Sequence, residues 1–140
     1  MSLFDAFKGE VKLAKEEAAF GLLFVAIAAD GEIEADEQRA FFSTLARMRY
    51  FDRFDFDGAM RKVSRLVRDK GMEGFVALAC EALEERVKRP LLLNFLDLLI
   101  SDGRVAAQEE RLASLVVEKL GVEESYVKNA LAVISEKNGM

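Results

Sequence analysis

Apolar side chains recur every three or four residues along most of the chain, which is the spacing of the buried stripe of an amphipathic α-helix. One example is Val11, Ala14, Ala18, Leu22 and Val25. No segment alternates apolar and polar residues in the manner of a half-buried strand. The pattern therefore predicts an all-α fold of about seven helices. Their predicted ranges are 10–29, 34–48, 57–70, 72–88, 90–100, 108–120 and 123–136.

Residues that begin or end helices lie at the borders of these ranges. Gly71 and Gly121 follow apolar stripes, and glycine readily adopts the left-handed backbone that ends a helix. Asp55 or Asp57 is expected to cap the third helix, because a carboxylate at that position accepts hydrogen bonds from free N–H groups. Pro90 is expected in the first turn of the fifth helix, where its missing N–H breaks no hydrogen bond.

Two segments are apolar on nearly every side. They are residues 20–29, which end the first predicted helix, and residues 91–100, which end the fifth. A helix that is apolar all round is buried, so both segments are expected at the centre of the fold. Each spans about half of the ~20 residues that a membrane-spanning helix needs. The N-terminus carries no signal-peptide pattern, and the chain is expected to be cytoplasmic.

Each apolar segment leads into a copy of the same short motif. The first copy is ADGEIEADE over residues 29–37, and the second is SDGRVAAQE over residues 101–109. In both, a β-branched apolar residue follows the Asp-Gly pair by two positions, and a glutamate closes the motif. Two copies with helices on both sides predict an internal duplication of a helix–turn–helix unit. The predicted halves are about 10–48 and 90–120, joined by helices within 57–88 in a single domain over 1–140.

The repeated turn has a structural interpretation. Asp-Gly ends one helix, Ile33 or Val105 packs beneath the turn, and the glutamate supports the N-terminus of the next helix. The turn also resembles the second half of an EF-hand loop. That site is excluded, because the positions of its first calcium ligands fall on apolar residues, Ala26 and Ala28 in the first copy.

The functional interpretation joins the two turns. If the halves pack against each other, the turn carboxylates converge, and they repel one another unless a cation bridges them. Oxygen ligands suit Ca, Mg or Mn, and the absence of histidine argues against zinc. Further candidate ligands are Glu32 and Asp97, although Asp97 fits a solvent-facing helix position equally well. The main candidate ligands are Asp30, Glu37, Asp102 and Glu109.

The chain resembles the tellurite-resistance TerB family in its two Asp-Gly turns, each with a following glutamate and each between apolar helices. The similarity covers about residues 20–134. It implies an all-helical fold with an internal repeat, and a cation site at the four turn carboxylates named above. Members are linked to tellurite resistance, to phage and colicin resistance and to other stress responses. The second turn of this chain is less acidic, because Arg104 stands where the first has Glu32. Likewise, Gln108 stands where the first has Asp36.

Charge is distributed unevenly along the chain. The 140 residues carry a net charge of −5, which argues against general nucleic-acid binding. Residues 47–70 nevertheless hold eight basic and four acidic residues. This stretch is a candidate surface for an acidic protein partner or anionic lipid heads, and the alternative is a solvated helix face. The candidate partner-binding residues, at helical spacing, are Arg61, Lys62, Arg65 and Arg68.

The N-terminal segment and the single cysteine complete the candidate features. Leu3, Phe4 and Phe7 lie on one side of a short amphipathic segment. This segment is interpreted either as a cap over the core or as a weak membrane-surface element. Cys80 lies among apolar residues, so it is predicted to be a buried thiol without a reactive role.

Three functions are consistent with these features. The first is a non-enzymatic cytoplasmic module that binds a protein partner and is regulated by a divalent cation. The second is a scaffold or membrane-associated adaptor that acts through the basic helix over 57–70. The third is a metal-dependent hydrolase. A chain without histidine cannot form a Ser-His-Asp triad, a Cys-His pair or a Glu-x-x-His di-iron site. A hydrolytic site of carboxylates and a metal stays open but is disfavoured, because it would need an open cleft and a metal-bound water.

Overall fold

The computed structural model describes residues 12–29, 31, 33–100 and 105–139. This part of the chain contains six α-helices and one 3-10 helix and no strand, which confirms the all-α prediction. The elements are α2 Lys15–Ala28, α3 Ala35–Ala46, η1 Arg49–Phe51, α4 Phe56–Ala82, α5 Glu85–Leu99, α6 Ala107–Leu120 and α7 Glu124–Asn138.

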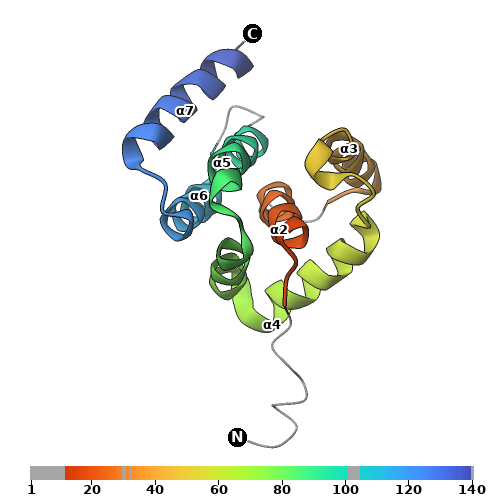
Figure 1. Ribbon diagram of the computed structural model, residues 1–140. Helices are drawn as coiled ribbons and strands as arrows, with labels where there is room; N and C mark the ends of the chain where they lie inside the picture. Colours follow the sequence, from red (N-terminus) through yellow and green to blue (C-terminus); the bar gives the residue numbers. More distant parts are fainter. Residues whose placement is uncertain (1–11, 30, 32, 101–104, 140) are drawn as a thin grey trace, which may run out of the picture.

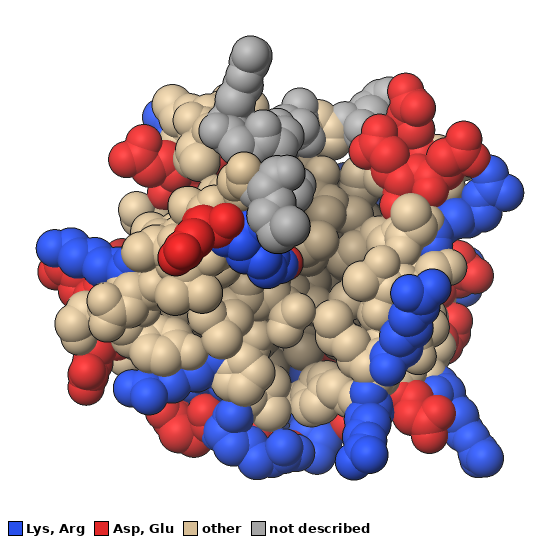
Figure 2. Space-filling view, turned by 90° about the horizontal axis from the view of Figure 1, so that it is seen from above, with Lys and Arg blue, Asp and Glu red and all other residues tan. Residues whose placement is uncertain are grey.

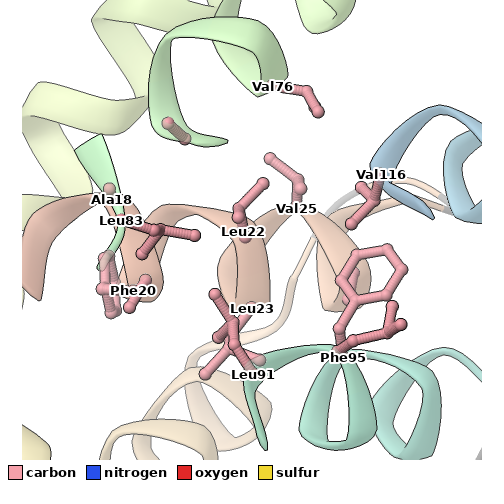
Figure 3. Close-up of a cluster of buried hydrophobic side chains, with 14 of the residues drawn as sticks. Ala18, Phe20, Leu22, Leu23, Val25, Val76, Leu83, Leu91, Phe95 and Val116 are labelled. Carbon is pink, nitrogen blue, oxygen red and sulfur yellow. The ribbon is translucent and has the colours of Figure 1, made fainter. Parts of the chain in front are cut away.

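α2 passes through the centre of the fold, between α4 and α5 (Figure 1). Residues 18–23 are all buried, so this part of the helix is covered on every side, whereas Phe24 and Ile27 are half-buried. Figure 3 shows side chains of α2 in one cluster with Val76 of α4, Phe95 of α5 and Val116 of α6. The predicted central position of the first apolar segment is therefore confirmed.

α5 differs from its prediction in two respects. It begins at Glu85, so Pro90 is its sixth residue and not part of its first turn. The missing N–H of Pro90 deletes one hydrogen bond inside the helix. Burial of Val87 and Leu91 on the same face explains why the helix nevertheless extends towards Glu85. The second apolar segment also is not buried all round, because Leu93 is 37% exposed.

Glycine and aspartate mark the ends of helices largely as predicted. Gly71 has φ 75° and ψ 169°, which breaks α4 between the third and fourth predicted helices. Gly121 ends α6 in the left-handed conformation, with φ 70°. Asp55 caps α4, and its carboxylate accepts a hydrogen bond from the Gly58 N–H at 3.0 Å. The first helix begins at Lys15 and not at residue 10, because Lys12–Ala14 are not helical.

Phe20 organises an aromatic cluster that attaches α3 and the following connection to α2. Its side chain is 0% exposed, and its ring centroid lies 5.7–6.0 Å from those of five other phenylalanines. Tilted and edge-on ring pairs of this kind each contribute about 0.5–1.5 kcal/mol beyond the area that they bury. The residues in contact with Phe20 are Phe24, Phe41, Phe42, Phe54 and Phe56.

An ion pair joins the C-terminal helix to α5. The Lys137 ammonium lies 2.7 Å from Asp97 Oδ2, and the Asn138 amide donates to Asp97 Oδ1 at 3.2 Å. Partial burial by itself would raise the pKa of Asp97, but the hydrogen bonds from Lys137 and Asn138 and the charge of Lys137 hold that pKa below its ordinary value. Asp97 is therefore engaged within the fold.

Gly21 tests how closely α2 and α4 pack. A Cβ atom at Gly21 would collide with the buried ring of Phe75 and lie 3.1 Å from Val63 Cγ2. Gly21→Ala is expected to lower the free energy of unfolding by about 1–3 kcal/mol, because the core cannot take the extra methyl. Urea denaturation measures this. At Gly74, where the nearest atom is Lys70 Cβ at 3.1 Å and that side chain is exposed, alanine is expected to be neutral or stabilising. Equal losses of unfolding free energy in Gly21→Ala and Gly74→Ala would contradict the close packing of α2 against α4 at Gly21.

Asp97→Asn tests the ion pair between α5 and α7. Because the folded pKa of Asp97 is lowered, its stabilisation is present above the ordinary carboxyl pKa and is lost as pH falls through the lowered value. The pair is partly exposed, so the variant is expected to lose no more than about 1 kcal/mol at neutral pH. That difference is expected to vanish in acid, as measured by denaturation across pH. Glu136→Gln on α7, which breaks no ion pair among the described residues, is the control. A loss from Asp97→Asn that stays constant with pH would refute the assignment.

Candidate functional site

The two repeated turns follow the ends of α2 and α5, which lie side by side (Figure 1). Three of the predicted ligands, Asp30, Glu32 and Asp102, lie outside the described residues. Gly31 is described, and its φ of 135° is the positive value that the Asp-Gly turn requires. Its N–H donates to the Ala28 carbonyl at 3.2 Å, which closes the end of α2.

Residues beside the two turns line common hollows. Ile27 and Glu37 from the first half and Leu98 from the second surround a hollow of about 310 Å³. Ala29 and Gln108 line another, also of about 310 Å³. The described residues next to each turn are therefore neighbours of residues from the other half.

The two closing glutamates of the motif have different environments. Glu109 lies in the first turn of α6, and its Oε1 accepts a hydrogen bond from the Ala106 N–H at 3.1 Å. Glu109 therefore supports the N-terminus of α6, as the structural interpretation of the repeated turn predicts. Glu37 is exposed in the first turn of α3 and forms no ion pair within the described residues. Ile33 is half-buried as expected, whereas Val105 is 50% exposed, so the prediction that it packs beneath the turn is wrong.

Within the described residues, no group of three or more Cys, Asp or Glu side chains is placed to hold a metal ion. The four-carboxylate site depends on Asp30 and Asp102, so it stays a prediction. Asp97, the additional candidate, is already engaged by Lys137 and Asn138. The turns also differ in their arginines. Arg39 pairs with Asp36 in the first half, whereas Arg111 has the uncharged Gln108 at the corresponding position.

The predicted partner-binding residues on α4 divide into two groups. Arg61, Arg65 and Arg68 are exposed. Lys62 is half-buried, and its ammonium lies 2.8 Å from Glu17 Oε1 and 2.9 Å from the Lys12 carbonyl oxygen. Lys62 therefore fastens the start of α2 to α4. The three arginines remain available at the surface, and Arg61 and Arg65 border a hollow of about 300 Å³.

Basic residues outnumber acidic ones by eight to four in the stretch from residue 47 to residue 70. Of its eight basic residues, only Lys62 forms an ion pair within the described part of the chain. In Figure 2, Lys and Arg side chains from several parts of the chain lie along the lower edge of the face, with Asp and Glu side chains among them. The seven exposed residues without an ion pair are Arg47, Arg49, Arg53, Arg61, Arg65, Arg68 and Lys70.

A third feature, which the sequence did not indicate, is an apolar groove beside α2. α2, η1 and α5 enclose a hollow of about 290 Å³, which we call the apolar groove. Figure 2 looks down on α2 between α3 and α5 and shows an uncharged hollow near the middle of that face. No periodicity signals this groove, because it depends on which helices pair in space. Its lining residues are Ala19, Leu23, Met48, Arg49, Tyr50, Phe51, Arg86, Val87, Pro90, Leu91 and Asn94.

The single cysteine has no reactive environment. Cys80 is 6% exposed, and burial raises the pKa of its thiol to about 11. The nearby charges of Lys88 and Lys119 oppose this effect without cancelling it. The prediction of a buried structural thiol is confirmed.

One comparison with known proteins finds a family that matches most of the chain. A family model described as tellurite resistance protein TerB matches residues 16–132, which include both repeated turns. No curated protein and no solved structure matches the chain. Over the described residues, no helix is both long enough and apolar enough to cross a membrane. Because the match covers most of the chain and the described residues are helical throughout the same region, the chain belongs to the TerB family.

Proposed function

We propose that this TerB-family chain is a non-enzymatic interaction module of a cytoplasmic stress response, and that it binds an acidic protein segment on α4. The supporting observation is the set of three exposed arginines, Arg61, Arg65 and Arg68, none of which forms an ion pair within the described residues. Their spacing places them along one side of the first part of α4. We call this surface the α4 basic face.

The chemistry of arginine favours a carboxylate-rich partner. A guanidinium group presents a planar fork of N–H donors that matches both oxygens of a carboxylate. Seven exposed cations without ion pairs within residues 47–70 repel one another, and an acidic partner relieves that repulsion. The net charge of −5 disfavours nucleic acid, since the acidic remainder of the protein would repel a phosphate backbone.

The non-enzymatic part of the proposal follows from the side chains that catalysis would need. The sequence contains no histidine, and its single thiol is buried with a raised pKa. Nucleophilic catalysis requires an activated nucleophile with a neighbouring base. A hydrolase would have to use a metal held by the turn carboxylates, together with an open position for water.

A divalent cation between the turns is the second part of the proposal. It is supported by the hollow that Glu37 shares with Leu98, since Leu98 precedes Asp102 by four residues in the sequence. A cation there would link the two halves and adjust their packing. Ca, Mg and Mn all accept carboxylate ligands.

Charge reversal tests the α4 basic face. Arg61→Glu/Arg65→Glu/Arg68→Glu is expected to weaken binding of a polyglutamate peptide by roughly tenfold or more, which corresponds to about 1.4 kcal/mol. Fluorescence anisotropy measures this, and raising the salt concentration is expected to weaken binding to the wild type, because salt screens exposed charges.

The matched control reverses three exposed charges elsewhere: Arg111→Glu, Lys119→Glu and Lys128→Glu. An equal loss in this control would mean that only net charge matters, against the proposal. Vesicles containing phosphatidylserine test the adaptor alternative. Binding to vesicles with no binding to the peptide would favour that alternative.

Calorimetric titration with Ca and with Mn tests the cation site. We expect a saturable heat in the wild type that is lost in Asp30→Asn/Asp102→Asn, because two ligand charges are removed. Glu109→Gln keeps an oxygen that caps Ala106 but removes the charge, so it is expected to weaken binding without changing the metal-free melting temperature. Asp52→Asn/Asp57→Asn, at exposed positions away from the turns, is the control. Absence of heat with both metals would reject the site.

A further inference from the structure

The apolar groove is lined mainly by side chains that belong to the core. Ala19 and Leu23 of α2 are each 1% exposed, and Val87 and Leu91 of α5 are also buried. Sites for small molecules are hollows of about 300–1,000 Å³ that are lined chiefly by apolar and aromatic side chains. At about 290 Å³ the groove lies at the lower end of that range, so it suits the apolar part of a small ligand.

The groove is long enough for a short hydrocarbon chain. Its α5 side extends from Val87 to Asn94, which are seven residues, or about 10 Å of helix, apart. Met48 lines the groove and is half-buried. A methionine side chain is flexible and polarisable, so it can adapt to the shape of a bound apolar group. A linear chain of the length of an octyl group therefore fits the groove.

The charged residues that line the groove are both cationic, Arg49 and Arg86. Arg49 is exposed and forms no ion pair within the described residues. Arg86 Nε donates to Glu84 Oε2 at 2.9 Å, so its charge is already partly balanced. A guanidinium group binds a carboxylate through parallel, charge-assisted hydrogen bonds. Arg49 thus favours a ligand that carries a carboxylate at one end of its apolar part.

The lining of the groove differs in charge from that of three other hollows in the described part of the chain. Glu37, Asp69 and Glu73 each line one of those hollows. An acidic side chain repels a carboxylate that is held close to it. The apolar groove contains no acidic residue among the described residues that line it. It is therefore the better site for an anion with a hydrocarbon chain.

Tyr50 contributes its ring to the groove and not its hydroxyl. The hydroxyl is buried and has no hydrogen-bond partner among the described residues. Burial and the charges of Glu16 and Glu84 raise the pKa of Tyr50, so the hydroxyl stays protonated. Neither glutamate lines the groove, but both would repel an anion placed at the hydroxyl. The carboxylate of a ligand is therefore expected at Arg49.

We infer that the apolar groove binds a small amphipathic carboxylate of the medium-chain fatty acid class, with its hydrocarbon chain between α2 and α5 and its carboxylate beside Arg49. Described residues alone form this site, and the N-terminal Leu3, Phe4 and Phe7 lie outside them. The inference goes beyond the proposed function, because no residue of the α4 basic face lines the groove.

Methionine methyl signals in NMR spectra report on the groove directly. Met48 lines it, whereas Met60 and Met72 are half-buried residues of α4 that do not. Titration with octanoate is expected to shift the Met48 signal saturably and to leave the Met60 and Met72 signals unchanged. Hexanoate is expected to bind about tenfold more weakly, because it buries fewer methylene groups.

Substitution of one arginine tests the carboxylate contact. Arg49→Gln is expected to weaken octanoate binding by roughly tenfold, the loss of one charge-assisted hydrogen bond, and to leave binding of octanol unchanged. The matched control is Arg47→Gln, at an exposed arginine that does not line the groove. Arg47→Gln is expected to leave the affinity for octanoate unchanged.

Filling the groove tests the place of the hydrocarbon chain. Asn94→Trp is expected to abolish binding of both octanoate and octanol, because the indole occupies the groove. The matched control is Thr44→Trp, in a separate hollow. Asn94 and Thr44 are both exposed, and each side chain donates to the carbonyl four residues earlier, so the two variants lose the same kind of contact. Circular dichroism checks that both variants fold.

Four outcomes would overturn the inference. The Met48 signal could stay unchanged with octanoate, or the Met60 and Met72 signals could shift as much. Arg47→Gln could weaken binding as much as Arg49→Gln, which would mean that only net charge matters. Octanol could bind as tightly as octanoate, which would exclude a carboxylate contact. The Met48 signal could shift with protein concentration alone, which would place a second copy in the groove. None of these outcomes affects peptide binding at the α4 basic face.

Discussion

The fold depends on burial of the middle of α2, residues 18–23. Once residues 18–23 are covered on all sides, α4, α5 and the cluster around Phe20 have little freedom in where they pack. Close packing makes such a centre intolerant of added volume as well as of lost volume. Gly21 shows the consequence, because it is the position where α2 and α4 approach too closely for a side chain. The other helices pack around the buried middle of α2, and its close packing limits where they can lie.

Polar interactions are placed where the outer elements meet the centre. Glu17 accepts a hydrogen bond from the Ala14 N–H and also pairs with Lys62, so one carboxylate both caps α2 and ties it to α4. Glu84 similarly contacts Lys15 and Arg86. These contacts are at least partly exposed, and their energies are modest. Their main effect is to define register and orientation, while burial supplies most of the stability.

Local chemistry was predictable from the sequence, and tertiary pairing was not. The break at Gly71, the cap at Asp55 and the support from Glu109 each depend on residues close in the chain. The predicted start of α5 at residue 90 was wrong, because burial of Val87 and Leu91 outweighs the preference of Pro90 for a first turn. The ion pair between Asp97 and Lys137 of α7 joins residues far apart in sequence, and so does the lining of the apolar groove. No periodicity carries that information.

Gly71 also affects how the arginine-bearing surface of α4 could change over evolutionary time. Its positive φ breaks α4 into a first part that carries the arginines and a second part that carries Phe75 and Val76 into the core. The direction in which the arginines face is therefore set by one backbone hinge, at a residue with open space around it. A lineage could re-aim the part of α4 that carries the arginines through this hinge while the buried half of α4 stays unchanged. The placement of surface charge and the stability of the core would then be inherited as separable traits.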